Sequence, residues 1–260
     1  EYISPNYVEL SDLKEEEILG FHSKFFLHVD DRQKFEYAFQ KVLEEAESSE
    51  TLEVRVQNKT GNWRYFELVL TNLLNDDAVN GIVAYYRDIN EKKKAADQIY
   101  KMAYYDFLTQ LPNRRKLISL LESAIKIAKN KNKKFSLMVL DLHGLKFVND
   151  LLGTHVGDRL LQKAAVRMVQ NIGKRGIVFR TDGDEFAVIL PNVSSEQTHQ
   201  IASGVIEAIN EPFTINKYEL FLAINIGISV YPDSGLDLND LQKNAYSAMH
   251  ASKSVGRNCY

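Results

Sequence analysis

The fold of the second half of the chain is decided by one stretch, Ile177-Val-Phe-Arg-Thr-Asp-Gly-Asp-Glu-Phe-Ala-Val-Ile-Leu190. Two apolar runs, residues 177–179 and 186–190, flank the polar segment Thr181-Asp-Gly-Asp184. Asp-Gly between two apolar strands is a strong hairpin signal, because both central residues of such a turn need positive φ. The stretch therefore predicts a β-hairpin whose turn carries acidic side chains.

The segments around this hairpin alternate between strand and helix patterns. The apolar run Phe135-Ser-Leu-Met-Val-Leu140 ends at Asp141, which predicts a buried central strand with a carboxylate at its tip. Helical spacing predicts helices over 156–169, 194–209 and 238–252, and a further strand is predicted over 220–230. Strands and helices that alternate around one mixed sheet make this half α/β or ferredoxin-like α+β.

The first half has a different pattern. Apolar residues at helical spacing predict a helix over 35–46, and alternation with period two predicts a strand over 52–56. Asn58-Lys-Thr-Gly61 is a turn signal, and two more strands are predicted over 63–73 and 80–89. Three consecutive antiparallel strands after short helices predict an α+β module of the kind that sensors use.

Length and charge support two domains. The chain has 260 residues, enough for two domains at about 100–200 residues each. Residues 1–104 hold 13 Lys and Arg against 20 Asp and Glu, net −7, and residues 105–260 hold 19 against 15, net +4. We therefore expect an anionic ligand in the second, basic half.

Composition excludes several classes of protein. Hydrophobic residues make up 45% and charged residues 26%, which is typical of a globular chain and not of a disordered one. The longest apolar runs fall far short of the roughly 18 residues that span a bilayer. The single cysteine, Cys259, excludes an internal disulfide and a cysteine-based metal cluster. We expect a cytoplasmic fragment of a longer protein, and membrane anchoring upstream of Glu1 is left open.

Residues 91–104 form a charged segment without glycine or proline, which predicts a helix between the two halves. Ile89, Ala96, Ile99 and Ala103 are spaced so that they can form one apolar stripe. Two interpretations remain, a plain connecting helix and a signalling coiled coil that joins two protomers.

Two groups of acids point to chemistry in the second half. Asp141 ends the central strand, and Asp184 and Glu185 follow the hairpin turn. If the two strands are neighbours, these acids converge at one edge of the sheet, where oxygen ligands suit a hard divalent cation such as Mg²⁺. The loop after Asp141 contains Gly144, which allows backbone N–H groups to approach a phosphate.

Basic side chains complete this pattern. Lys146, Lys253 and Arg257 are available to neutralise phosphate oxygens, and the last two lie four residues apart. Acids for a metal together with bases for phosphate are typical of phosphoryl transfer. The alternative is that these charges belong to a solvated surface and that Asp182 and Gly183 form only a turn.

Five stretches of the first half form a further pattern. They are Tyr2-Ile-Ser-Pro5, Gly20-Phe21, His28-Val-Asp-Asp31, Gly61-Asn-Trp-Arg64 and Asp88-Ile-Asn90. Together they resemble the PAS family of sensor domains over residues 1–90, with the family's first strand missing. A PAS domain holds heme, flavin, a small metabolite or nothing, so the PAS ligand is left open. We interpret His22 and His28 as loop or packing residues and Trp63 as core.

Five motifs follow one another across the second half. They are Asp106-Phe-Leu-Thr-Gln-Leu-Pro-Asn-Arg-Arg115, Asp141-Leu-His-Gly-Leu-Lys-Phe-Val-Asn-Asp150, Gly157-Asp158, Arg180-Thr-Asp-Gly-Asp-Glu-Phe186 and Lys253-Ser-Val-Gly-Arg-Asn258. In this order they resemble the GGDEF family, the diguanylate cyclases, over residues 105–260. The family implies a nucleotidyl-cyclase-like, ferredoxin-like domain with a central mixed sheet flanked by helices.

The resemblance also implies roles for individual residues. Asp141 and Asp184 would bind Mg²⁺ or Mn²⁺ with help from the carbonyl of Leu142, and Glu185 would lie at the metal or near the ribose 3′-OH. Asn149 and Asp158 would hydrogen-bond guanine, whose N1–H and N2–H edge adenine lacks, and so select GTP.

The same resemblance assigns the phosphates of GTP to a basic loop. They would be held by Lys146, Lys253, Arg257, Gly183 and the loop amides of His143, Gly144 and Leu145. Asp184, Glu185 and Lys146 would be the catalytic residues.

The implied reaction needs a homodimer. Each domain binds one GTP, each 3′-OH attacks the α-phosphate of the other nucleotide, pyrophosphate leaves and cyclic di-GMP forms. The PAS domain at 1–90 would then control the GGDEF domain at 105–260 through the helix at 91–104. We expect no nucleic-acid partner.

Three departures from the family pattern modify this expectation. Asp182 replaces the first glycine of the signature, and His143 stands where the family usually has Asp. Gly173 and Gly176 replace the Arg and Asp of the product-inhibition motif, so we predict no such site. Two hypotheses follow: an active diguanylate cyclase, or a GTP-binding regulatory domain with weak or no cyclase activity that controls a downstream EAL phosphodiesterase.

Overall fold

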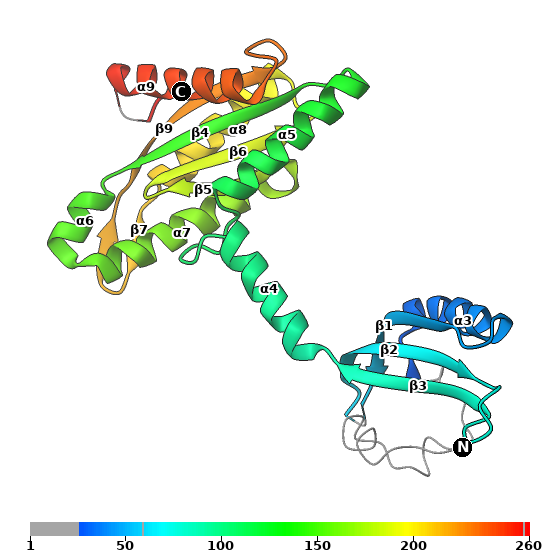
Figure 1. Ribbon diagram of the computed structural model, residues 1–260. Coiled ribbons are helices and arrows are strands. Elements are labelled where there is room, and N and C mark those ends of the chain that lie inside the picture. The colour runs from blue at the N-terminus through cyan, green and yellow to red at the C-terminus, as the bar shows by residue number, and fades with distance from the viewer. Residues whose placement is uncertain (1–25, 59, 257) are drawn as a thin grey trace. The chain divides into compact units, whose positions relative to one another are not determined.

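The computed structural model describes residues 26–58, 60–256 and 258–260. It divides the chain into two compact units, residues 1–99 and 100–260, whose elements are labelled in Figure 1. The stretches 2–5 and 20–21, His22 and Arg257 lie outside the described residues. None of the helices in the described ranges is long and apolar enough to cross a membrane.

The first unit contains a three-stranded antiparallel sheet with a helix against it. Its elements are α3 (Val29–Glu44), β1 (Ser49–Gln57), β2 (Trp63–Leu73) and β3 (Gly81–Asp88), and the strands lie in the order β1-β2-β3. Phe35 and Val42 of α3 belong to one buried cluster with Phe66 and Leu68 of β2. The three predicted strands are therefore confirmed.

Helix α3 begins at Val29, earlier than the predicted start at Phe35. Its first turn is polar and is fixed by capping, which apolar spacing does not detect. The ring Nδ1 of His28 accepts a hydrogen bond from the backbone N–H of Asp30 at 3.3 Å, and Asp30 and Asp31 are acids at the positive end of the helix dipole.

Trp63 was expected in the core, and this expectation was wrong. Its side chain is 40% exposed, and its ring meets the edge of His28 at a centroid distance of 4.8 Å. Side chains alternate between the two faces of a strand, and in β2 the core face carries Phe66, Leu68 and Leu70. Trp63 is out of phase with these residues and points away from the core.

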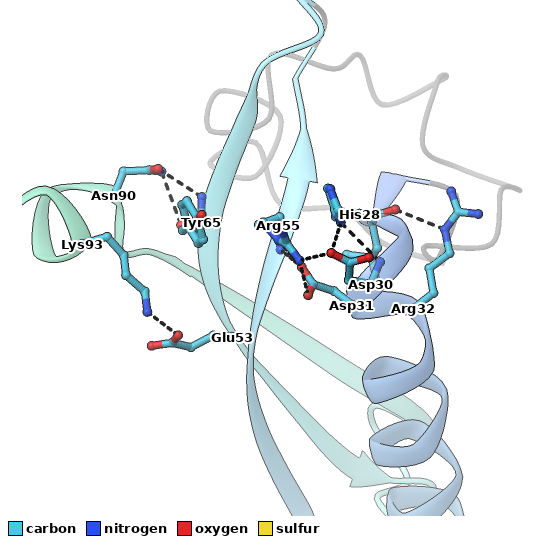
Figure 2. A network of polar contacts seen from close by, with 10 residues as sticks. His28, Asp30, Asp31, Arg32, Glu53, Arg55, Tyr65, Asn90 and Lys93 are labelled. Carbon is cyan, nitrogen blue, oxygen red and sulfur yellow. Dashed lines mark hydrogen bonds and ion pairs between the residues drawn. The ribbon is translucent and has the colours of Figure 1, made fainter. Parts of the chain in front are cut away.

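A polar network ties the start of α3 to β1 (Figure 2). Asp31 is only 4% exposed, and its carboxylate accepts hydrogen bonds from Nε and Nη2 of Arg55 at 2.8 and 2.9 Å. These bonds from Arg55 outweigh burial and hold the pKa of Asp31 below its usual value. Asn90, at the start of α4 (Asn90–Tyr104), accepts from and donates to the backbone of Tyr65 at 3.1 and 3.3 Å.

The second unit is a four-stranded sheet with helices on both faces. Its elements are α5 (Arg114–Lys131), β4 (Phe135–His143), α6 (Leu145–Leu152), α7 (Thr154–Ile172), β5 (Ile177–Asp182), β6 (Glu185–Pro191), α8 (Ser195–Asn210), β7 (Phe213–Ile215), β8 (Tyr218–Leu220), β9 (Ala223–Tyr231) and α9 (Leu238–Val255). The sheet has the order β5-β6-β4-β9, and β7 and β8 form a separate hairpin.

The helix-flanked sheet agrees with the expected fold class, but its pairings differ from those of a mixed sheet. All three pairs of neighbouring strands are antiparallel. Strands β4 and β5 run in the same direction, and β6 lies between them because the hairpin turn returns the chain next to β4.

Strand β4 is buried on both faces, as its continuous apolar run predicts. Met138 and Leu140 share a buried cluster with α7 and α8, whereas Leu137 and Val139 share another with α5 and α9. Because side chains alternate along a strand, Asp141 continues the face that α5 and α9 cover. The fold therefore places this carboxylate beside the last turns of α9.

Candidate functional site

The signature hairpin turns one residue later than the sequence suggested. Asp182 is the last residue of β5 and pairs with Glu185, so Gly183 and Asp184 are the two central residues. Gly183 has a φ of +27°, in keeping with hairpin turns that place glycine first. Asp182 has strand geometry, which any residue can adopt, and its exposed carboxylate accepts a hydrogen bond from the N–H of Gly183 at 2.9 Å.

The structure brings the two predicted groups of acids together. Asp141 of β4 stands opposite Glu185 of β6 in the register of the sheet. The backbone N–H of Leu142 donates to the carbonyl of Asp184 at 3.1 Å, which fixes the turn against the end of β4. The backbones at Asp141, Asp184 and Glu185 thus meet at one end of these strands.

Asp141 is 8% exposed and lies between two basic side chains. Its Oδ2 is 2.9 Å from Nζ of Lys253 and 3.3 Å from Nε2 of His143. His143 also hydrogen-bonds through Nε2 to Oδ1 of Asn225 at 2.9 Å. Two predicted phosphate-binding residues therefore contact the predicted metal ligand directly.

Asn225 of β9 is a site residue that the sequence analysis missed. Its side chain is fully buried, and its Nδ2 donates to Oγ of Ser252 at 3.1 Å and to the carbonyl of Gly256 at 2.9 Å. These bonds hold the closing motif against β9, next to Asp141. A lone amide in an otherwise apolar strand is the signal that could have identified it.

The predicted base-recognising residues lie on α6 and α7. Asn149 of α6 packs directly over Gly157 of α7, where an added Cβ would lie 1.7 Å from the Oδ1 of Asn149. This Oδ1 is buried and has no hydrogen-bond partner among the described residues. Asp158, next to Gly157, is exposed.

The predicted phosphate loop caps α6. Gly144 has a φ of +103° and is the residue before the helix, where a Cβ would approach the carbonyl of Phe221 to 3.3 Å. Leu145 is buried, whereas the side chain of Lys146 is exposed. At this helix N-terminus, the loop therefore offers a ligand its backbone groups and the exposed basic side chain of Lys146.

Comparison with known proteins identifies both parts of the chain. Residues 103–259 match the family described as "Diguanylate cyclase, GGDEF domain". The chain belongs to the GGDEF family. Residues 1–83 match the family described as "PAS fold", so a PAS domain precedes the GGDEF domain.

Several curated proteins are similar to this GGDEF chain. It is 35% identical to the signaling protein YkoW of Bacillus subtilis over 184 residues, which are 70% of this chain and 23% of YkoW. It is 27% identical to a diguanylate cyclase of Vibrio cholerae over 260 residues, 99% of this chain and 80% of that protein. The chain spans about a quarter of the length of YkoW and of MucR, a bifunctional diguanylate cyclase/cyclic di-GMP phosphodiesterase of Pseudomonas aeruginosa that is 35% identical.

Solved structures agree with the fold of the second unit. The GGDEF domain of YfiN from Pseudomonas aeruginosa is 30% identical, with a TM-score of 0.58, and covers 60% of this chain and 92% of that one. A sensory box/GGDEF family protein from Caulobacter crescentus is also 30% identical, with a TM-score of 0.56, over 59% of this chain and all of that chain.

The GGDEF domain has a second missed residue at the hairpin, Tyr246 of α9. Its hydroxyl donates a hydrogen bond to Oε2 of Glu185 at 3.1 Å. Burial, followed by the negative charge of Glu185, raises the pKa of Tyr246 above its ordinary value. Tyr246 therefore stays protonated at neutral pH and orients Glu185 as a donor.

The predicted metal ligands are two carboxylates and one backbone carbonyl, from Asp141, Asp184 and Leu142. Within the part of the chain that the structure describes, no three His, Cys, Asp or Glu side chains gather into a metal-binding group. An all-oxygen set that is completed by phosphate and water is nevertheless the chemistry that Mg²⁺ and Mn²⁺ prefer. The donors present fit such an ion.

The segment in place of the product-inhibition motif is tightly packed at one end. Gly173 begins the 3-10 turn Gly173–Arg175 and is exposed with a φ of +57°. Gly176 is crowded, because an added Cβ would lie 2.5 Å from the carbonyl of Ile189. The motif's Asp has no room at position 176 in this backbone.

Proposed function

We propose that the chain is a diguanylate cyclase module under the control of a PAS sensor. The domains we assign are a PAS sensor at 1–90, a linker helix at 91–104 and a cyclase domain at 105–260. The domain would condense two GTP into cyclic di-GMP and two pyrophosphates. Family membership supports this class of activity.

The buried, unpartnered Oδ1 of Asn149 is the observation that carries the nucleotide-binding part of the proposal. A buried acceptor without a partner is costly, and an exocyclic N–H of a base would satisfy it. Asp158 stands on the adjacent helix and can accept from the N1–H and N2–H of guanine. Adenine lacks this donor pair, which is why we assign GTP as the substrate.

The phosphates would lie between the loop at Gly144 and the hairpin. Backbone amides of residues 143–145, the ammonium groups of Lys146 and Lys253, Gly183 and Arg257 would hold them. Lys253 pairs with Asp141 in the structure, so nucleotide binding would require this ammonium group to turn from the carboxylate to the phosphates.

Asp141, Asp184 and the carbonyl of Leu142 would hold Mg²⁺ or Mn²⁺, as the oxygen donor set allows. When bound, the ion supplies positive charge that neutralises the triphosphate. The ion would also compensate Asp141 once Lys253 leaves it, so that the nearly buried carboxylate is never left without a cation.

The proposed reaction joins two nucleotides across two copies of the chain. The 3′-oxygen of one GTP bonds to the α-phosphorus of the other, and the bond from that phosphorus to the oxygen of the β-phosphate breaks. The 3′-OH proton passes to water as pyrophosphate leaves. Glu185, whose carboxylate accepts a hydrogen bond from Tyr246, would accept a hydrogen bond from the 3′-OH. Repetition with the roles exchanged closes the ring.

A regulatory role without turnover is the second candidate. Asp182 adds a carboxylate at the turn where the family has glycine, and His143 contacts Asp141 where the family has an acid. Such a domain would bind GTP and control an EAL phosphodiesterase elsewhere in the full-length protein. MucR, which is similar to this chain, carries both activities in its name.

Incubation with GTP and Mg²⁺, followed by mass spectrometry, separates the two candidates. Cyclic di-GMP that disappears in Asp184→Ala and persists in Glu122→Ala, an exposed acid on α5, supports the cyclase. GTP binding in calorimetry without any product would contradict the cyclase and favour the regulatory role. An increase in Asp182→Gly would show that the altered signature limits turnover.

A further inference from the structure

A second basic hollow lies on the other side of the hairpin. It is open, has a volume of about 470 Å³ and forms where the N-terminus of α5 meets the turn between β5 and β6. Three arginines and two acids line it, together with Asn113, Thr181 and Gly183; the charged residues are Arg114, Arg115, Arg180, Asp106 and Asp182. None of the roles assigned above uses Arg114, Arg115 or Thr181.

The three arginines of the hollow differ in their partners. The guanidinium group of Arg180 already has partners: its Nη1 donates a hydrogen bond to Asp106 at 2.8 Å, and its Nε donates one to the carbonyl of Gly183 at 3.0 Å. Arg114 and Arg115 are exposed, and no hydrogen bond or ion pair joins either of them to another described residue. Two guanidinium groups are therefore available to an incoming anion.

Their position on the helix makes these charges unusual. Helix α5 begins Arg114-Arg-Lys-Leu117, so three cations occupy its first turn. Cations at a helix N-terminus oppose the dipole, and each costs some stability unless an anion compensates it. The hydroxyl of Thr181 is buried in the same wall and faces the hydroxyl of Tyr246. The wall thus combines the two unpaired guanidinium groups of Arg114 and Arg115 with a buried hydroxyl.

The hollow borders the proposed nucleotide site at the turn, because Gly183 belongs to both, and Asp141 lies farther from it. Asp141 is on β4 and the hollow borders β5, two strands away, which is about 10 Å at the usual strand spacing. The charge of Arg114 acts on Tyr246, the residue that orients Glu185. A ligand in the hollow would therefore lie near Tyr246 and Glu185.

We propose that this hollow binds a phosphoryl group, and that the group is the triphosphate of the GTP held by a facing second copy of the chain. This inference rests on the proposed function, because only a two-copy reaction brings a second triphosphate to Glu185. The guanidinium groups of Arg114 and Arg115 match phosphate oxygens in a fork geometry. The alternative source is a phosphate of the same chain's GTP.

Titration of the 260-residue chain with pyrophosphate tests the site without any turnover. We expect the arginine side-chain Nε–H signals of Arg114 and Arg115 in NMR spectra to shift on addition, and to do so equally in Lys253→Gln, which weakens the other phosphate site. The shift of the backbone amide of Thr181, which lines only the hollow, should be smaller in the double variant Arg114→Gln/Arg115→Gln. Arginine signals that do not respond, or that lose their response in Lys253→Gln, would overturn the proposal.

Turnover measurements then distinguish the two sources of phosphate. We expect the double variant to bind GTP within about twofold of the wild-type affinity at dilutions where the chain is monomeric, and to lose about ten- to hundredfold in kcat. Lys126→Gln on the same helix is the matched control and should change neither quantity. Weaker GTP binding by the monomer would assign the hollow to the chain's own nucleotide, and an unchanged kcat would refute the role in turnover.

Folding of the variants is not expected to obscure these results. Removal of cations from the positive end of α5 should leave the melting temperature unchanged or slightly higher. If wild-type chain makes no cyclic di-GMP, the cyclase proposal fails on its own, and the pyrophosphate titration still decides whether the hollow binds a phosphoryl group.

Discussion

At the scale of single residues, the nearly buried carboxylate of Asp141 depends on its cation. Lys253→Met removes the ammonium group 2.9 Å away and, among the described residues, leaves His143 as the basic neighbour of the carboxylate. We expect the free energy of unfolding of the GGDEF domain to fall by about 1–3 kcal/mol at neutral pH in urea denaturation. Lys243→Met, an exposed position on the same helix, is the control, and equal stability of the two variants would contradict this account.

Asp31 provides a second prediction at this scale, on pH. Its pKa in the folded PAS domain is lowered, chiefly by hydrogen bonds from Arg55. A lowered folded pKa contributes stability that is fully present above the unfolded pKa and is lost as pH falls through the folded value. Below about pH 4, unfolding free energy should fall more steeply in wild type than in Asp31→Asn. Asp77→Asn, at an exposed turn, should keep the wild-type slope; a wild-type slope in Asp31→Asn would refute the prediction.

At the scale of elements, the packing of α9 on β9 determines where Lys253 stands. Gly227 of β9 is the contact point, because an added Cβ would lie 2.0 Å from the carbonyl of Ala245. Gly227→Ala should therefore push the helix outward, cost about 1–3 kcal/mol and weaken GTP binding. Gly204→Ala has its nearest neighbour at 3.4 Å and should leave thermal stability and calorimetric affinity intact. An equally stable Gly227→Ala would show that α9 can shift without loss.

Local sequence patterns explain which helices and strands could be predicted and which were missed. The hairpin and β4 were predicted because their apolar patterns are local and continuous. Helix α5 was not predicted, although Leu117 and Leu121 have helical spacing and are buried. The turn centre was misplaced by one residue, because Asp-Gly and Gly-Asp are both acceptable turn pairs until the strand register is known.

The two missed site residues, Asn225 and Tyr246, contact side chains that are distant from them in the sequence. Asn225 meets His143 across two paired strands, and Tyr246 reaches Glu185 from a helix near the end of the chain. No local pattern encodes either contact, since each arises from packing of β9 and α9 on the sheet. Asp141, Asp184 and Glu185 could be predicted because each lies directly after an apolar run or at the hairpin turn.

At the scale of the whole molecule, the proposed reaction needs two copies of the chain. The rate of cyclic di-GMP formation per chain should therefore rise with protein concentration in the range where the chain is mostly monomeric, and level off once it is dimeric. Product measured over a dilution series, with the oligomeric state followed by light scattering, checks this. A specific rate that is constant for a monomeric chain would contradict the two-copy mechanism.

The crowding at Gly176 has a consequence for any signalling circuit that contains this chain. A carboxylate cannot be restored there by one substitution, because its Cβ would collide with the backbone of β6. Product inhibition through this segment is therefore prevented by the packing of Gly176 as well as by the absence of the motif's Arg and Asp side chains. For the proposed cyclase, we therefore expect cyclic di-GMP to accumulate without inhibition through this segment.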